Sequence, residues 1–96
     1  MKCIYALTDS EGIPRYIGQA YFVPGRAREH YMSAWRGAWD QLSPMARWIR
    51  SIHAIPQFRV LIQVEDDLAL QTETAVIVAA RQRFPGMLFN TLPVLS

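Results

Sequence analysis

The sequence predicts a single α/β (α+β) domain whose elements follow one another in the order ββααβα. Three observations support this fold class: a strand, turn and strand at the start, apolar residues at helical spacing in two central segments, and a strand followed by a long helix near the end. The connections are short, and 96 residues of which 51% are hydrophobic match the size and composition of one ordinary domain. We therefore expect residues 1–96 to form one domain.

The first two strands are expected to form a hairpin. Residues 2–7 and 15–18 are short segments rich in strand-forming residues, and the sequence TDSEG between them is typical of a turn. If the loop is symmetric, Tyr5 lies opposite Tyr16. Because cross-strand partners share a face of the sheet, the two phenols would then lie side by side.

Two helices are expected next. Pro24 and Gly25 are expected to break the chain, after which apolar residues recur at helical spacing over residues 26–39. Ser43 followed by Pro44 is typical of a helix start, since serine caps the first turn and proline is tolerated at the first helical position. Pro56 is expected to end this second helix.

The third strand and the third helix complete the predicted order. Apolar and polar residues alternate over residues 58–64, which indicates a strand with one buried face. Asp66 and Asp67 supply the negative charge and the capping oxygens that favour a helix start, and the helix is expected to run to about Phe84.

Glu73 is the most informative single residue of the predicted third helix. It lies in the middle of an apolar arc made of Leu70, Val76, Ile77, Ala80 and Phe84. A carboxylate on a core-facing stripe is costly to bury unless a cation or a hydrogen-bond network satisfies it. Helix geometry alone leaves two interpretations open: a structural carboxylate that pairs with an arginine or escapes at the mouth of a cleft, and a ligand for a hard divalent metal such as Mg²⁺.

Composition excludes several classes of protein. With Cys3 as the single cysteine, the chain can form neither an intrachain disulfide nor a thiolate zinc cluster, which is typical of an intracellular protein. The longest apolar run, residues 75–80, is far shorter than the roughly 20 residues of a membrane span, and the first residues do not have the pattern of an export signal. We expect a cytoplasmic protein.

The basic residues suggest a phosphate-bearing partner. Nine of the ten are arginine, whose planar guanidinium can grip phosphate with two hydrogen bonds. On the first predicted helix, Arg26 and His30 are four residues apart and share one flank, while Arg28 projects from the other side. Arg47 and Arg50 share the short second helix. Arg28, Arg47 and Arg50 are candidate phosphate contacts, although charged residues on helices are often only solvated.

Taken together, these residues resemble the GIY-YIG nuclease family. The segment CIYALTDSEGIPRYIGQA is similar to the opening of that family, with an IY pair in the first strand and an intact YIG in the second. The later positions that match are Arg26, His30, Glu73 and Asn90. The segment SPMARWI also looks like a stretch common in small stand-alone members. Two residues depart from the pattern: Cys3 stands at the first glycine position of the motif, and Ala20 stands where Thr or Ser is common.

The resemblance implies a small three-stranded antiparallel sheet flanked by helices, and a metal-dependent endonuclease that hydrolyses phosphodiester bonds in DNA. Glu73 would hold one Mg²⁺ or Mn²⁺ ion, and Tyr5 or Tyr16 would activate the attacking water. A tyrosine has an ordinary pKa near 10, so a basic phenol requires nearby cations to lower that pKa. Arg26 would stabilise the charge of the transition state, and His30 would accept the proton.

The resemblance also implies supporting roles and partners. Gly18 would keep the space beneath the phosphate clear, and Asn90 would fix a tyrosine or the glutamate. Phosphate contacts by arginine predict DNA binding of low sequence specificity. A further possibility, from the length of the chain, is a subunit that a partner protein targets. Trp35 and Trp39 leave room for a homodimer surface. The alternative function is a catalytically silent domain of the same fold that binds nucleic acid or another protein.

Overall fold

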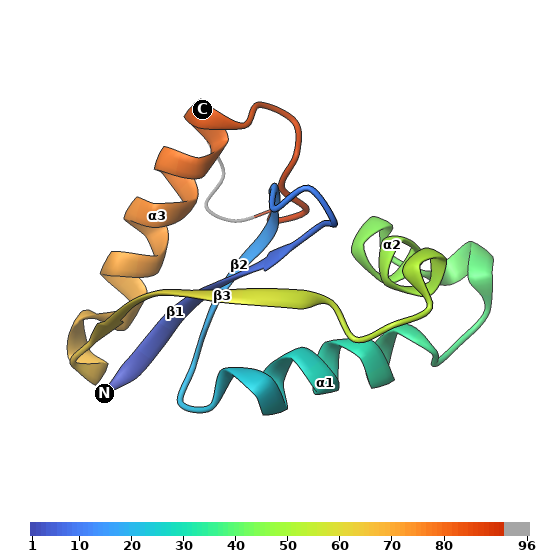
Figure 1. Cartoon of the computed structure of the whole chain (residues 1–96), viewed down its shortest axis with the longest axis horizontal. Coiled ribbons are helices and arrows are strands. Elements are labelled where there is room, and N and C mark those ends of the chain that lie inside the picture. Colours follow the sequence, from blue (N-terminus) through green and yellow to red (C-terminus); the bar gives the residue numbers. More distant parts are fainter. Residues whose placement is uncertain (92–96) are drawn as a thin grey trace.

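The computed structural model describes residues 1–91 and confirms an α+β fold with a three-stranded antiparallel sheet, strand order β2-β1-β3 (Figure 1). The strands are β1 (Lys2–Thr8), β2 (Pro14–Ala20) and β3 (Gln57–Val64). The helices are α1 (Val23–Ala34), α2 (Pro44–Ile52) and α3 (Ala69–Arg83), with two short 3₁₀ turns, η1 (Trp39–Gln41) and η2 (Asp66–Leu68). The order of the main elements is ββααβα, as predicted. None of the helices within residues 1–91 is both long and apolar enough to cross a membrane.

The core consists of two layers on either side of the central strand β1. The side chains of Cys3, Tyr5 and Leu7 point to one face and pack with the buried residues of α1. Ile4 and Ala6 point to the other face and pack with α3. Successive side chains of a strand alternate between faces, so β1 can be buried on both sides only because a helix covers each. Figure 1 shows α1 and α3 on different sides of the sheet.

The pairing of β1 with β2 differs from the predicted register. Tyr5 lies opposite Gly18, and Tyr16 lies opposite Leu7, so the direct pairing of the two tyrosines was wrong. The regular pairing is interrupted between Leu7 and Thr8, which makes the loop asymmetric. The resulting shift is two residues, an even number, and the two phenols therefore remain on the same face as diagonal neighbours.

The first helix begins earlier and ends earlier than predicted. Pro24 lies in the first turn of α1 rather than before it, because a proline there removes only an N–H group that has no partner within the helix. The helix ends at Ala34, and Gly37 then adopts a left-handed conformation with φ of 82°. Trp39, expected on the last turn of this helix, lies in η1 instead.

The second helix has the predicted start. The Ser43 hydroxyl accepts a hydrogen bond from the Ala46 N–H at 3.2 Å, and Pro44 follows as the first helical residue. The helix ends at Ile52, where His53 adopts a left-handed conformation with φ of 51°. Pro56 therefore follows the end of the helix and does not cause it.

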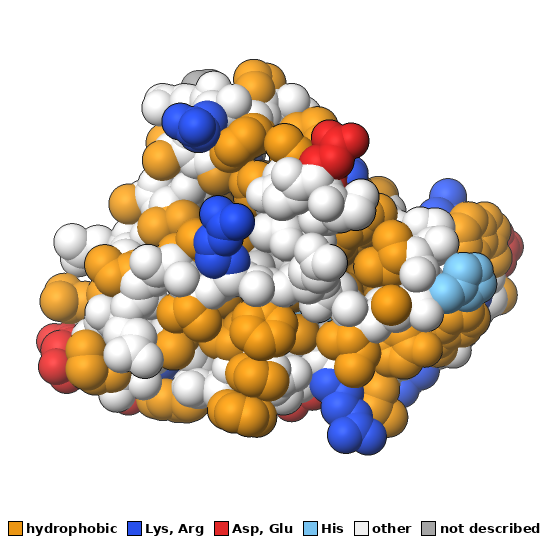
Figure 2. Space-filling view, in the orientation of Figure 1, with side chains coloured by type: hydrophobic (Ala, Val, Ile, Leu, Met, Phe, Trp, Pro, Cys, Tyr) orange, Lys and Arg blue, Asp and Glu red, His pale blue; other side chains and the backbone are white. Residues whose placement is uncertain are grey.

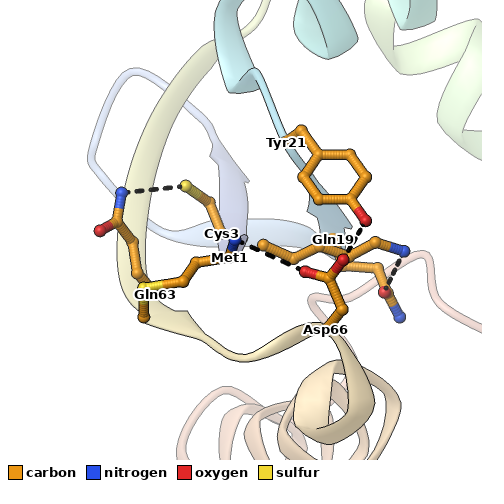
Figure 3. Close-up of polar contacts among 7 residues, drawn as sticks. Met1, Cys3, Gln19, Tyr21, Gln63 and Asp66 are labelled. Atoms are coloured by element: carbon orange, nitrogen blue, oxygen red, sulfur yellow. Dashed lines mark hydrogen bonds and ion pairs between the residues drawn. The ribbon is translucent and has the colours of Figure 1, made fainter.

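Asp66 and Asp67 do not cap the third helix as predicted. Both lie in η2, and α3 begins after it without a side-chain cap. Asp66 instead accepts a hydrogen bond from the Tyr21 hydroxyl and pairs with the Met1 ammonium group at 3.6 Å (Figure 3). The hydrogen bond from Tyr21 lowers the pKa of Asp66. These two contacts tie the start of β1 and the end of β2 to η2.

The third strand carries a bulge that the alternating pattern did not predict. Val60 pairs with Tyr5, whereas Ile62 pairs with Ile4, so Leu61 is an extra residue and the faces switch there. Since α3 packs mainly on β1 and β2, it leaves β3 uncovered, and four apolar side chains of this strand, Phe58, Val60, Leu61 and Ile62, are between 40 and 46% exposed. Figure 2 shows hydrophobic side chains gathered over this strand. The predicted buried face of residues 58–64 is therefore largely solvent-accessible.

Candidate active site

Three aromatic side chains from β1, β2 and α1 meet on the α1 face of the sheet. The Tyr5 hydroxyl lies 2.9 Å from His30 Nε2, within hydrogen-bond distance. The rings of Tyr16 and His30 meet edge to face with centroids 5.1 Å apart, and the two tyrosine rings are 6.4 Å apart. We call these three residues the Tyr–His cluster.

Gly18 positions the Tyr–His cluster by its lack of a side chain. Tyr5 is 1% exposed, and its ring lies directly across Gly18 on the neighbouring strand. A Cβ atom at Gly18 would be 2.6 Å from the Tyr5 hydroxyl oxygen, closer than such atoms approach in proteins. The glycine of the YIG motif thus gives the phenol the space in which it can reach His30. The expected role for Gly18, clearance beneath a phosphate, stays a prediction.

Replacing Gly18 with Ala is expected to displace the Tyr5 ring and lower the free energy of unfolding by about 1–3 kcal/mol, the usual effect of overpacking a core. The measurement is chemical denaturation, together with the NMR signals of the His30 ring. Gly25→Ala is the control, because its Cβ would meet only the exposed and movable ring of Phe22. Equal stability of wild type and Gly18→Ala would contradict the packing argument.

Both phenols are held in their neutral form. Burial raises the pKa of Tyr5, and the nearby Tyr16 and Glu73 add to the rise. Burial and Glu73 also raise the pKa of Tyr16. Arg26 acts in the opposite direction on both but is outweighed. Arg26 therefore lowers the pKa of both phenols as expected, but burial is the larger effect and the pKa of each phenol is raised overall.

His30 is suited to accept a proton. Burial lowers its pKa below 6.5, the Arg26 guanidinium lowers it further, and Glu29 acts in the opposite direction. The imidazole is consequently neutral at pH 7. The direction of the hydrogen bond to Tyr5 depends on the tautomer: with the imidazole proton on Nδ1, the Tyr5 hydroxyl donates and Nε2 of His30 accepts.

Arg26 lies one helical turn before His30, on the exposed edge of the Tyr–His cluster. Its guanidinium forms an ion pair with Glu29 at 3.1 Å, and 45% of its side chain is exposed. It influences the pKa of both tyrosines and of His30, so its charge acts on the whole cluster. Arg28 is exposed on the same helix.

Glu73 lies on α3, the helix that covers the face of the sheet opposite to the Tyr–His cluster. It is half-buried, and its Oε2 accepts a hydrogen bond from Gln19 Nε2 at 2.5 Å. Gln19 Oε1 in turn accepts from Lys2 Nζ at 3.1 Å, a contact drawn in Figure 3. The carboxylate is close enough to raise the pKa of Tyr5 and Tyr16. Sequence reasoning did not single out Gln19, although its place directly after the YIG motif is a usable signal.

The surroundings of Glu73 bear on the two interpretations of this carboxylate. Its partner among residues 1–91 is the neutral Gln19 and not an arginine, so the arginine-paired form of the structural interpretation is absent there. Leu70, expected beside it on the buried arc, is 71% exposed, whereas the preceding Ala69 is 1% exposed, so one flank of this end of α3 faces solvent. Glu73 thus combines partial burial with access to solvent.

The donor set around Glu73 fits one kind of metal. Within the described part of the chain, no group of three or more His, Cys, Asp or Glu side chains is placed to hold an ion. Zinc sites in proteins use three or four such ligands, whereas Mg²⁺ is commonly held by one or two carboxylates, with waters and substrate phosphates completing its shell. Oε1 of Glu73 is not used by Gln19 and remains available. A Mg²⁺ or Mn²⁺ ion held by Glu73 with mainly non-protein ligands stays a prediction.

Asn90 contacts backbone, not a catalytic side chain. Its Oδ1 accepts from the Ile17 N–H at 2.9 Å, and its Nδ2 donates to the Ile17 carbonyl at 2.8 Å. Phe89 N–H also donates to the Arg15 carbonyl at 2.7 Å. The segment after α3 therefore closes the free edge of β2, and Figure 1 shows it beside the β1–β2 hairpin. Asn90 holds β2 between Tyr16 and Gly18, whereas a direct bond to a tyrosine or to Glu73 was expected.

Arg47 and Arg50 are engaged with the loop that joins α1 to α2. Arg50 donates to the carbonyl of Ala34 at 2.6 Å and to that of Gly37 at 2.8 Å, and it thereby satisfies the last turn of α1. Arg47 donates to the Trp39 carbonyl at 3.2 Å. These bonds occupy guanidinium N–H groups that phosphate binding would require. Both arginines therefore stabilise the loop between α1 and α2.

Replacing Arg50 with Ala is expected to lower the free energy of unfolding by about 1–3 kcal/mol, because charged hydrogen bonds to the end of α1 are lost. Thermal or chemical denaturation measures this effect. Arg36→Ala is the matched control, since that side chain is exposed in the same loop. If Arg50→Ala has the stability of the wild type but binds DNA more weakly, the main role of Arg50 is to contact phosphate and not to stabilise the fold.

Comparisons with known proteins gave no match: no family model fits the chain, and no curated protein or solved structure is similar to it. The resemblance to GIY-YIG nucleases accordingly rests on the motif residues themselves.

Proposed function

We propose that the protein is a metal-dependent endonuclease of the GIY-YIG type, which hydrolyses phosphodiester bonds in DNA. The observation that carries the proposal is the 2.9 Å contact between the Tyr5 hydroxyl and a neutral His30, with Tyr16 beside it. A phenol that donates to a neutral imidazole is arranged for proton transfer. Arg26 and Glu73 add a positive and a negative charge that both act on the phenols.

The two phenols and the imidazole account for proton movement. A water that attacks phosphorus must lose a proton, and Tyr5 can accept it on its oxygen while passing its own proton to His30 Nε2. This relay never requires a free phenolate, so it is compatible with the raised pKa of Tyr5. Tyr16 lies against the other side of His30 and orients the ring.

The charges account for stabilisation of the transition state. Arg26 is exposed enough to meet a phosphate and can balance the negative charge that develops on it. Glu73 would hold a Mg²⁺ or Mn²⁺ ion. When bound, such an ion supplies positive charge at the phosphate oxygens and offsets the effect of Glu73 on the phenols.

The proposal extends to partners and location. DNA is bound with low sequence specificity, because arginine side chains contact mainly phosphates, and such contacts weaken with salt. Arg28 is the exposed candidate for such a contact. Trp35 and Trp39 are 44% and 52% exposed and are available to a second copy or to a targeting protein. A cytoplasmic location follows from the lone, buried Cys3.

Cleavage is expected to fall at acid pH as His30 becomes protonated. The pKa of His30 lies below its ordinary 6.5, so activity persists somewhat below that pH and is then lost. The same shift makes a contribution to stability that is present above pH 6.5 and is lost as pH falls through the lowered pKa. A pH–rate profile of the wild-type protein tests this, with an acid limb expected below pH 6.5. An acid limb centred above pH 6.5 would assign the titration to another group.

The test of the proposed function is the incubation of supercoiled plasmid with the protein and Mg²⁺ or Mn²⁺. Nicking is expected with either ion and is expected to stop when EDTA is added. The variants His30→Gln and Tyr5→Phe separate the chain's own activity from a contaminating nuclease. Nicking that both variants retain would overturn the assignment of the site.

The second candidate function is a catalytically silent nucleic-acid-binding domain. The raised pKa of both tyrosines favours it, because neither phenol is activated in the described chain. DNA binding without nicking under any of these conditions would select this function.

A further inference from the structure

A hollow of about 430 Å³ lies next to the Tyr–His cluster and plays no part in the chemistry described above. It is enclosed by the start of α2 on one side and by the segment after α3 on the other. Tyr16 belongs to both the hollow and the cluster. The other lining side chains that determine the polarity of the hollow include Pro44, Met45, Leu88, Phe89 and Thr91.

Both walls of the hollow are held in place by hydrogen bonds to backbone groups. Ser43 caps α2 and fixes its first turn, which carries one wall. The Phe89 N–H donates to the Arg15 carbonyl, and Asn90 clamps Ile17, so the other wall is attached to β2. The hollow therefore exists before any ligand binds, as is usual for sites that take small molecules or parts of them.

The lining favours a flat, neutral group over a phosphate. Most of it is apolar, and the aromatic ring of Phe89, with the Arg15 guanidinium 4.5 Å from its centroid, is one of its walls. Hydroxyl groups come from Tyr16, Ser43 and Thr91, whereas no lysine or arginine among residues 1–91 lines the hollow. A phosphate in the hollow would meet no lining residue of opposite charge. A nucleobase, with its apolar faces and its polar edges, matches this combination.

We propose that the hollow takes a nucleobase of the nucleic acid whose phosphate lies at the Tyr–His cluster. This inference rests on the proposed function, since it names the neighbouring group of the same substrate. Tyr16 connects the two places: its ring contacts His30 in the cluster and borders the hollow. A strand would thus be held by one unstacked base as well as by its phosphates, and single-stranded or distorted DNA would bind more tightly than regular duplex.

The first test is an NMR titration of the wild-type protein with thymidine 5′-monophosphate and, in parallel, with 2-deoxyribose 5-phosphate. The nucleotide is expected to shift the backbone amide signals of Met45 and Phe89, and the sugar phosphate, which lacks the base, is expected to leave them unchanged. Equal shifts with both ligands would overturn the proposal in favour of a phosphate at the start of α2. Shifts confined to other parts of the protein would overturn it as well.

The second test fills the hollow. Met45→Trp is expected to abolish the nucleotide-dependent shifts and to weaken binding of a single-stranded oligonucleotide by about ten-fold, the scale of one stacked base. Met32→Trp is the matched control, because Met32 is 49% exposed on α1 and does not line the hollow. Equal affinity of the two variants would overturn the proposal.

Neither test depends on cleavage, so the two hypotheses can fail separately. Base-dependent shifts in a protein that never nicks plasmid would reject the nuclease and keep the base site. Nicking without base-dependent shifts would reject the base site and keep the nuclease.

Discussion

Glu73→Gln is expected to reduce the rate of DNA cleavage by about 10³-fold or more, with the fold retained. Glutamine keeps the shape of the side chain and can still hydrogen-bond Gln19, but it lacks the negative charge that attracts a hard divalent cation. DNA binding should persist or become tighter, because one negative charge near the phosphates is removed. Single-turnover cleavage at saturating enzyme and a gel-shift titration measure the two effects separately.

The control for this variant is Glu11→Gln, which makes the same chemical change at an exposed position in the β1–β2 turn. It should cleave like wild type. If Glu73→Gln also nicks plasmid at the wild-type rate, the carboxylate serves only as the hydrogen-bond partner of Gln19, and the protein does not use a metal at this position.

Arg26→Ala is expected to lower the rate of turnover by about 10²- to 10³-fold, which is typical for the loss of one group that stabilises developing charge. Affinity for DNA should change much less, because the guanidinium matters most in the transition state. The ion pair that Arg26 forms with Glu29 is exposed, so its loss should hardly affect stability. Comparison of kcat with the dissociation constant for uncleaved DNA tests this difference.

Arg28→Ala is the matched control, two residues away on the same helix and also exposed. We expect it to weaken DNA binding slightly and to leave unchanged the rate at which bound DNA is cleaved. A result in which Arg26→Ala and Arg28→Ala lose affinity equally and keep their turnover would make both residues simple phosphate contacts.

Most of the fold could be predicted because its signals are local. The cap at Ser43 and Pro44 lies within one helical turn, and the hairpin depends on a few adjacent turn residues. The errors arose where distant parts of the chain decide the outcome. The bulge at Leu61 appears only when β3 pairs with β1, and the early end of α1 depends on Arg50, which binds the Ala34 carbonyl from another helix.

Of the candidate site, the sequence predicted that Tyr5 and Tyr16 lie close together, but not their interactions. Sequence spacing placed the two tyrosines on one face, and this remained true although their pairing shifted by two residues. The neutral state of both phenols was not foreseeable, because it follows from burial by α1 and from Glu73 on α3. The hydrogen bond between Gln19 and Glu73 likewise depends on how α3 packs against β2. The hydrogen bonds of Asn90 to the backbone depend on how the segment after α3 packs there.

The clamp between Asn90 and Ile17 has a consequence for the protein during its synthesis. The two residues are 73 positions apart, and the hydrogen bonds between them complete the outer edge of β2. A ribosome-bound chain that has not yet released residue 90 lacks this edge, and the backbone of the strand that carries Tyr16 and Gly18 is then paired on its β1 side alone. The site is therefore assembled late, after nearly all of these residues have left the ribosome, and contacts at such large separation in sequence slow the final step of folding.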